Sequence, residues 1–324
     1  PRPRRRVGHG GVGAGLLEHT CRMKQLLILI SIFVIGCKPT ADAPTLRTGK
    51  PRVAVVNYPL AYFMERIAGD LVEVHFPAME GDPAFWKPTG AEVRKFQSND
   101  LILLNGASYA KWPAWSSLPN SRMVNTSAAF RDAFIAVKTD TAHRHGKGGE
   151  HSHADMAFTT WLDFKQAQQQ AAAVHRALAN LLPTHSETLA KHFAGLQRDL
   201  LSLDADLRGI AADLGNTPLL GSHPVYQYLA RGYGLKIRSV HWEPDAMPDA
   251  EGWAELAVLR KTHPARAMLW EDAPDKSIVA ELKAQTIRSV VFAPCANRSG
   301  NGTDDWLTVM RANVVALRAA LGAE

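Results

Sequence analysis

Apolar residues recur with a helical spacing along residues 184–214. They follow one another at alternating steps of four and three, at Leu189, Phe193, Leu196, Leu200, Leu203, Leu207, Ile210 and Leu214. This spacing puts all of them on one stripe of an α-helix. Pro183 precedes the segment and Gly215 follows it, which are favoured residues at a helix start and stop. The pattern predicts one helix about 46 Å long, more than a single small lobe can enclose.

Strand-like runs alternate with helical patterns on both sides of this segment. Before it, runs rich in Val, Ile and Leu predict strands at 52–57, 71–76, 100–104 and 121–126, with helices at 60–67 and 92–98. After it, the same alternation predicts strands at 217–222, 236–241, 267–270 and 288–293, with helices at 225–233, 251–261, 276–284 and 304–321.

This alternation predicts an α/β fold: two lobes of mostly parallel sheet flanked by helices, joined by one long rigid linking helix. We place an N-terminal lobe at 51–183, the linking helix at 184–214 and a C-terminal lobe at 215–324. Ligand groups are expected at the carboxyl ends of the strands. The alternative for the long segment is an interaction helix or a coiled-coil seam.

The first residues have the pattern of an export signal. Residues 1–22 are basic and Gly-rich without a hydrophobic period, and we expect them to be upstream translation. A charged start, a short apolar run and the sequence VIGC ending at Cys37 predict a signal peptide over 23–37. VIGC resembles the lipobox of bacterial lipoproteins, which implies lipid attachment at Cys37. Residues 38–50 have the composition of a flexible tether.

The net charge of +6 belongs mostly to this leader. Residues 1–36 contain six Lys or Arg and one Glu, which is five of the six net positive charges. The remaining chain is therefore near neutral, and it carries no basic stripe with interleaved aromatic residues. The sequence thus gives no sign of a nucleic-acid partner.

Motif content argues against an enzyme. Cys21 lies in the leader and Cys37 would carry lipid, so Cys295 is left alone, with no disulfide or CxxC metal knuckle. A lone cysteine without a placed base is usually inert. The chain contains no GxSxG elbow, HExxH or P-loop pattern. We therefore expect a binding protein.

Several motifs resemble, in order and spacing, the zinc/manganese-type solute-binding proteins of bacterial metal ABC transporters. DPAFWKPT at 82–89 resembles the family's Asp-Pro-His-x-aromatic-Glu-Pro-Thr loop, and DLILLNG at 100–106 resembles the strand after it. WLD at 161–163 resembles the WLDP that opens the central helices. SHPVYQY at 222–228, followed by YGL at 233–235, resembles the SHxAFxYF…YGL segment.

This resemblance implies a metal-capturing lipoprotein of the cell envelope, on the periplasmic or extracytoplasmic face. It would be anchored to the membrane through Cys37 and would deliver its cargo to an ABC permease with its ATPase. The implied cargo is zinc, with manganese or another divalent metal as the alternative. We further expect a monomer.

The resemblance fails at the metal ligands. The family's ligands are His in the first loop, His two residues before the tryptophan of WLD, His or Glu in the third motif, and Asp near the last strand. The matching positions here are Ala84, Thr159, His223 and Ala293. Alanine offers no lone pair, and a neutral threonine hydroxyl is a poor zinc ligand. Of these positions, His223 alone can supply a good donor.

A histidine-rich stretch at 141–155 can supply the missing imidazoles. It holds four of the 13 histidines of the chain, at His143, His145, His151 and His153. We predict that His151 and His153 fold over the cleft beside His223, with the other two as weaker candidates. The alternative is a tract that collects metal with low affinity and has no part in the cleft.

Two carboxylates are weaker candidates, and other readings of the chain stay open. Asp82 and Glu243 each follow an expected strand, although either could instead be a turn acceptor or a helix cap. A divergent relative could bind another solute or a chelated metal through Asp82, Trp86 and Lys87. A surface lipoprotein for adhesion or metal buffering is the third reading.

Overall fold

Two four-stranded parallel sheets organise this computed structural model. The model describes residues 49–137, 143–145, 149–151, 156–298 and 305–321. The expected upstream segment, the signal peptide, Cys37 and almost all of the tether therefore lie outside the described residues. The described residues from 49 onward belong to one compact unit.

The N-terminal sheet has the strand order β2-β1-β3-β4, all parallel. Its strands are β1 (Arg52–Val55), β2 (Glu73–His75), β3 (Leu101–Leu104) and β4 (Met123–Asn125). The flanking helices are α1 (Tyr58–Ala68) and α2 (Gly90–Gln97). Both helix starts are capped as their sequences favour: the side chain of Asn57 accepts from Leu60 N, and Thr89 forms a capping box with Glu92.

The C-terminal sheet has the strand order β10-β9-β7-β8, again all parallel. Its strands are β7 (Pro218–Gly221), β8 (Lys236–Ser239), β9 (Ala267–Trp270) and β10 (Arg288–Val291). Its helices are α5 (Gln227–Tyr233), α6 (Ala250–Thr262), α7 (Lys276–Ala284) and α8 (Trp306–Leu321). The predicted strand-and-helix alternation is confirmed in both lobes.

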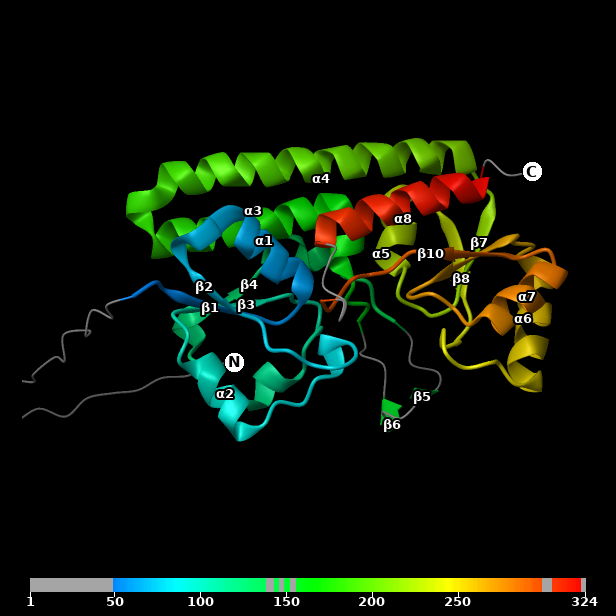
Figure 1. Cartoon of the computed structure of the whole chain (residues 1–324), viewed down its shortest axis with the longest axis horizontal. Helices are drawn as coiled ribbons and strands as arrows, with labels where there is room; N and C mark the ends of the chain where they lie inside the picture. Colours follow the sequence, from blue (N-terminus) through cyan, green and yellow to red (C-terminus); the bar gives the residue numbers. More distant parts are fainter. Residues whose placement is uncertain (1–48, 138–142, 146–148, 152–155, 299–304, 322–324) are drawn as a thin grey trace, which may run out of the picture. The chain divides into compact units, whose positions relative to one another are not determined.

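The long helix is α4 (Ser186–Leu214), which runs beside α3 (Phe164–Leu181) (Figure 1). It begins two residues later than predicted because Pro183–His185 forms a 3-10 turn. It ends at Gly215, whose φ of 54° few other residues adopt readily. The predicted apolar stripe is buried except for Phe193, which is half-buried. The stripe packs on α3, α1 and α8, so the coiled-coil alternative is wrong.

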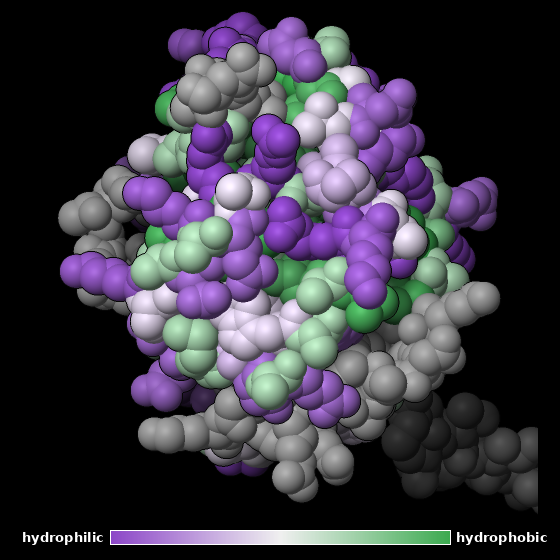
Figure 2. All heavy atoms as spheres, turned by 90° about the vertical axis from the view of Figure 1, so that its right-hand side faces the viewer, coloured by the Kyte–Doolittle hydropathy of each residue, from purple (hydrophilic) through white to green (hydrophobic). Residues whose placement is uncertain are grey.

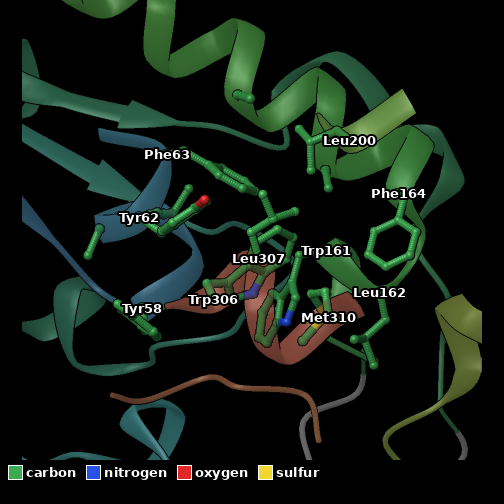
Figure 3. Packing of buried hydrophobic residues seen from close by; sticks show 14 of the residues in the cluster. Tyr58, Tyr62, Phe63, Trp161, Leu162, Phe164, Leu200, Trp306, Leu307 and Met310 are labelled. Carbon is green, nitrogen blue, oxygen red and sulfur yellow. The ribbon is translucent and has the colours of Figure 1, made fainter. Parts of the chain in front are cut away.

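Aromatic side chains from both ends of the sequence meet beneath this helix (Figure 3). Phe63 of α1 and Trp306 of α8 pack edge to face with ring centroids 5.2 Å apart, and Leu200 of α4 belongs to the same buried cluster. Trp161 is fully buried, and its Nε1 donates to Pro294 O at 2.8 Å. This cluster joins residues of both lobes, while a smaller second core lies within the C-terminal lobe.

The remaining elements are short. Two antiparallel strands, β5 (His143–His145) and β6 (Gly149–His151), pair within the histidine-rich stretch that the sequence pattern left as a loop. The 3-10 turns are Gly69–Leu71, Pro83–Phe85, Trp112–Trp115, Asn120–Arg122, Ala128–Ala133, Thr160–Leu162 and Pro183–His185.

The face of the C-terminal lobe seen in Figure 2 is dominated by hydrophilic side chains, with hydrophobic ones in recesses between them. Leu256 is the one residue of α6 that is fully buried, which agrees with a helix lying at the surface. In the described part of the chain, no helix has both the length and the apolar composition needed to cross a bilayer.

Candidate metal centre

The C-terminal sheet has a reversal of strand order, the feature beside which α/β proteins bind ligands. From β7 the chain moves to β8 on one side, and it then returns across β7 to β9 on the other. The loops after β7 and β9 therefore leave in opposite directions, and we call the carboxyl ends of these two strands the crevice of the sheet. His223 follows β7 by two residues, and Glu271 follows β9 directly.

Close backbone packing fixes the position of His223. Ser222 N donates to Leu269 O at 2.8 Å, and Trp242 N donates to Ser222 O at 2.7 Å, so the turn is held on both sides. A Cβ at Gly221 would lie 2.5 Å from Ser239 Oγ, which only glycine avoids. The His223 side chain is 11 % exposed, so its ring is largely enclosed.

Glu243 and His241 come from the strand exit beside His223. Nδ1 of His223 lies 3.9 Å from Oε1 of Glu243. The rings of His223 and His241 meet edge to face with centroids 5.7 Å apart. Two of the candidate ligands, His223 and Glu243, therefore lie near each other, and His241 is a neighbour that the sequence analysis did not name. Their role as metal ligands stays a prediction.

Glu271 brings a second carboxyl group to this place. Burial raises its pKa to about 8, with further contributions from the neighbouring Asp82 and Glu243 carboxylates. The backbone also joins the two strand exits, because Asp275 N donates to Pro244 O at 2.8 Å. Glu271 thus lies within electrostatic range of one carboxyl group from each lobe.

Asp82 enters this group from the N-terminal lobe, where it also has a structural role. It caps the 3-10 turn Pro83–Phe85 by accepting from Ala84 N at 2.8 Å, and it accepts from Tyr109 OH at 2.8 Å. Both bonds go to Oδ1. Burial raises the pKa of Asp82, and these two donors oppose the rise. The helix-cap alternative for Asp82 therefore agrees with its geometry.

The three positions at which the family's other ligands would stand carry no free donor. Ala84 is buried, and the Thr159 hydroxyl donates to Val225 O at 2.5 Å. Ala293 is held through its backbone by the Asn313 side chain, which donates to its carbonyl and accepts from its amide. These residues serve packing and contact between the lobes.

The histidine-rich stretch is described only in its backbone. The Cα of His143 pairs in register with that of His151, and His145 pairs with Gly149. His153 lies outside the described residues. The role predicted for His151 and His153 as ligands, and for His143 and His145 as weaker ones, stays a prediction.

The matching crevice of the N-terminal sheet is filled by amide side chains. The strand order there also reverses between β1 and β3, whose exits carry Asn57 and Asn105. Asn57 Nδ2 donates to Asn105 Oδ1 at 3.1 Å, and Gln170 Nε2 donates to the same oxygen at 3.1 Å. All three are buried, so this crevice is closed by uncharged groups.

The acidic and imidazole side chains lie near one another without forming a complete coordination sphere. Across the described ranges, no three His, Cys, Asp or Glu side chains stand in a group that could hold a metal ion.

A separate depression of about 590 Å³ lies at the amino ends of β7 and β8, lined by Lys236, Arg238 and His263 among others. It contains no carboxylate.

Comparison with known proteins places the chain in a family. The family model described as "Zinc-uptake complex component A periplasmic" (ZnuA) matches residues 53–320. The zinc-binding lipoprotein AdcA of Streptococcus pneumoniae is 24 % identical over 310 residues, which is 91 % of this chain and 61 % of that protein. The high-affinity zinc uptake system protein ZnuA of Bacillus subtilis is 23 % identical, over 91 % of this chain and 97 % of that one.

Solved structures share the fold. The zinc-bound ZnuA-like domain of S. pneumoniae AdcA matches with a TM-score of 0.70 at 20 % identity, over 85 % of this chain and 100 % of that one. The periplasmic zinc-binding protein TroA of Treponema pallidum matches with a TM-score of 0.66 at 21 % identity, over the same shares of the two chains. These likenesses confirm the predicted two-lobed fold with its long linking helix.

Proposed function

Since the chain belongs to the family of periplasmic zinc-uptake components A, we propose that it is the extracytoplasmic solute-binding component of a metal ABC transporter. It captures a divalent transition metal, with zinc as the favoured cargo, and delivers it to a membrane permease driven by an ATPase. Cys37 anchors it to the membrane through lipid. Zinc is named for several relatives, and for this chain it is part of the proposal.

The observation that supports capture most directly is the imidazole of His223 beside the carboxylate of Glu243. Neutral imidazole nitrogen and carboxylate oxygen are both good ligands for zinc and its neighbours in the first transition series. The site stands at the carboxyl ends of parallel strands, where this class of fold binds its ligands. His151 and His153 are proposed as further donors.

Calorimetric titration tests this function. Zinc is added to the chain from Lys38 onward, and to variants His223→Ala and His151→Ala/His153→Ala. We expect one ion per chain and at least tenfold weaker binding in the first variant, because a ligand nitrogen is lost. The matched control is His185→Ala, which removes an exposed imidazole on the turn before α4. Absence of zinc binding in the unsubstituted protein overturns the proposal.

The vacated positions Ala84, Thr159 and Ala293 favour one second candidate. A divergent member of the family could bind another solute or a chelated metal through Asp82, Trp86 and Lys87. Thermal unfolding separates the two, since a ligand that binds only the folded protein raises the midpoint. A rise with free zinc supports direct capture. A rise with a metal chelate but none with the free ion supports the second candidate.

A further inference from the structure

We infer that the depression at the amino ends of β7 and β8 binds a phosphate group, carried by a small molecule or by a lipid headgroup. Pro218, the first residue of β7, lines the depression, whereas His223 follows the other end of the same strand. The site is therefore separate from the candidate metal ligands, and the inference goes beyond the proposed function.

The size of the depression suits a phosphate group with a carbon skeleton attached. Its volume is about 590 Å³, and ligand pockets commonly measure roughly 300–1,000 Å³. Pro218, Leu235 and Pro264 give its lining an apolar part. Such a pocket holds the carbon part of a ligand by apolar contact, while a few polar groups fix its orientation.

Two permanent positive charges stand side by side in the lining. Lys236 and Arg238 are two residues apart on β8, so their side chains leave the same face of the strand, with Cα atoms about 7 Å apart. Both are exposed, and neither forms an ion pair within the described part of the chain. None of the described residues that line the depression is acidic. A phosphate group, which carries up to two negative charges near neutral pH, can neutralise both cations at once.

A hydrogen bond orients the guanidinium of Arg238. Its Nη1 donates to Oγ1 of Thr262 at 3.2 Å, and Thr262 also lines the depression. Nε and Nη2 are left for the two parallel bonds with which arginine binds phosphate oxygens. The neutral Thr262 hydroxyl positions this side chain without cancelling its charge.

The ring of His263 adds a fixed nitrogen to the same lining. His263 is 8 % exposed, and its Nε2 lies 2.8 Å from Leu219 O. A carbonyl oxygen only accepts, so Nε2 carries a proton and donates it. Within the described residues, Nδ1 has no hydrogen-bond partner. This nitrogen can donate to a phosphate oxygen once the ring takes up a second proton, which a neighbouring anion favours.

Calorimetric titration with phenyl phosphate tests the site. The chain from Lys38 onward is compared with its variants Lys236→Gln and Arg238→Gln, and the control Lys283→Gln removes the same charge from the exposed side of α7. We expect binding at least fivefold weaker in each of the first two variants and less than twofold weaker in the control. Benzoate, which has the same ring and one negative charge, should bind at least fivefold more weakly than phenyl phosphate.

Vesicles distinguish a free molecule from a lipid headgroup. Sedimentation with phosphatidylcholine vesicles is measured with and without phosphatidic acid, using the same variants. Binding to phosphatidic acid that is lost in Arg238→Gln supports the headgroup as the source. Binding of phenyl phosphate without such vesicle binding supports a small molecule. If neither phenyl phosphate nor phosphatidic acid binds, or if Arg238→Gln and Lys283→Gln bind alike, the inference is wrong.

Thermal unfolding without ligand tests a purely structural role of the two cations. Asn216, just after α4, and Thr262, the last residue of α6, line the same depression, and the ends of these helices carry partial negative charge. Because Lys236 and Arg238 are exposed, we expect both variants to keep the midpoint of the unsubstituted protein. Earlier unfolding with unchanged phenyl phosphate binding would assign the cations to the helix ends and overturn the inference.

Discussion

The surroundings of Cys295 determine both its backbone conformation and the pKa of its thiol. It adopts a φ of 55°, in the left-handed region that non-glycine residues seldom occupy. The turn it makes delivers Ala296 O to Tyr58 N at 2.8 Å, a contact between the segment after β10 and α1. Burial raises the pKa of its thiol to about 12, with a smaller contribution from Asp305.

The raised pKa predicts an unreactive thiol. A raised pKa means that the neutral form is favoured, so at pH 8 the thiolate fraction is about a thousandfold below that of an ordinary cysteine. We expect iodoacetamide to modify Cys295 at least a hundredfold more slowly in the native protein than in guanidinium chloride. Mass spectrometry of timed samples measures both rates. Native modification within tenfold of the unfolded rate would contradict the burial described here.

At the same scale, the sequence predicted some of the side chains that gather at the exits of β7, β8 and β9, and it missed others for a physical reason. His223 and Glu243 were found because each follows a strand pattern or a family motif. Glu271 was missed although it directly follows the buried run Ala267–Trp270, where the carboxyl-end rule would have pointed to it. Its place near His223 and Glu243 depends on strand order, which brings β9 beside β7, and local pattern does not encode strand order.

Among the helices too, one could be predicted from the sequence pattern and another could not. The position of α4 could be predicted because its buried residues are large and aliphatic against a polar background. The other central helix, α3, gave no such pattern. Its buried face is mostly alanine and glutamine, which lack the large aliphatic side chains that mark the stripe of α4, so the family resemblance alone pointed to helices there.

The buried face of α4 can be tested with two leucine substitutions in the same helical turn. Leu203 is 2 % exposed and belongs to the main core, whereas Leu201 in the same turn is 50 % exposed. We expect Leu203→Ala to lower the free energy of unfolding by about 3 kcal/mol, because it removes buried methyl groups and leaves a cavity. Leu201→Ala should change it by less than about 0.5 kcal/mol. Urea unfolding measures both, and equal effects would refute the assigned helix face.

One carboxylate on α4 ties three helices together. Asp199 accepts from Arg66 of α1 at 2.7 Å and from Arg311 of α8 at 3.0 Å. All three side chains are partly exposed, so water weakens the pairs, and we expect Asp199→Ala to cost about 1 kcal/mol. Asp206→Ala, on the exposed side of α4, is the control and should be nearly neutral. The difference should shrink in 1 M salt, and a salt-independent loss would point to packing instead of charge.

At the scale of the whole molecule, the segment 293–298 after β10 connects the lobes. Trp161 donates to Pro294 O, and Asn297 Nδ2 donates to both Met79 O and Gly81 O at 2.9 Å. Arg298 pairs with Glu65 of α1. These contacts hold the loop that precedes Asp82, and Asp82 is one of the two carboxylates that act on Glu271. The segment after β10 is therefore coupled by hydrogen bonds to the first loop of the N-terminal lobe.

This coupling predicts that a substitution outside the crevice alters metal capture. Asn297→Ala frees two loop carbonyls and should cost about 1–2 kcal/mol in unfolding free energy. Hydrogen exchange at residues 77–85 should accelerate, because the loop loses its tie to the other lobe. Zinc affinity should fall severalfold if Asp82 is a ligand, since Asp82 no longer holds a fixed position. Asn120→Ala, at an exposed turn of the N-terminal lobe, should leave exchange and affinity unchanged. Faster exchange with undiminished affinity would show that Asp82 takes no part in capture, and that the C-terminal crevice binds its ion unaided.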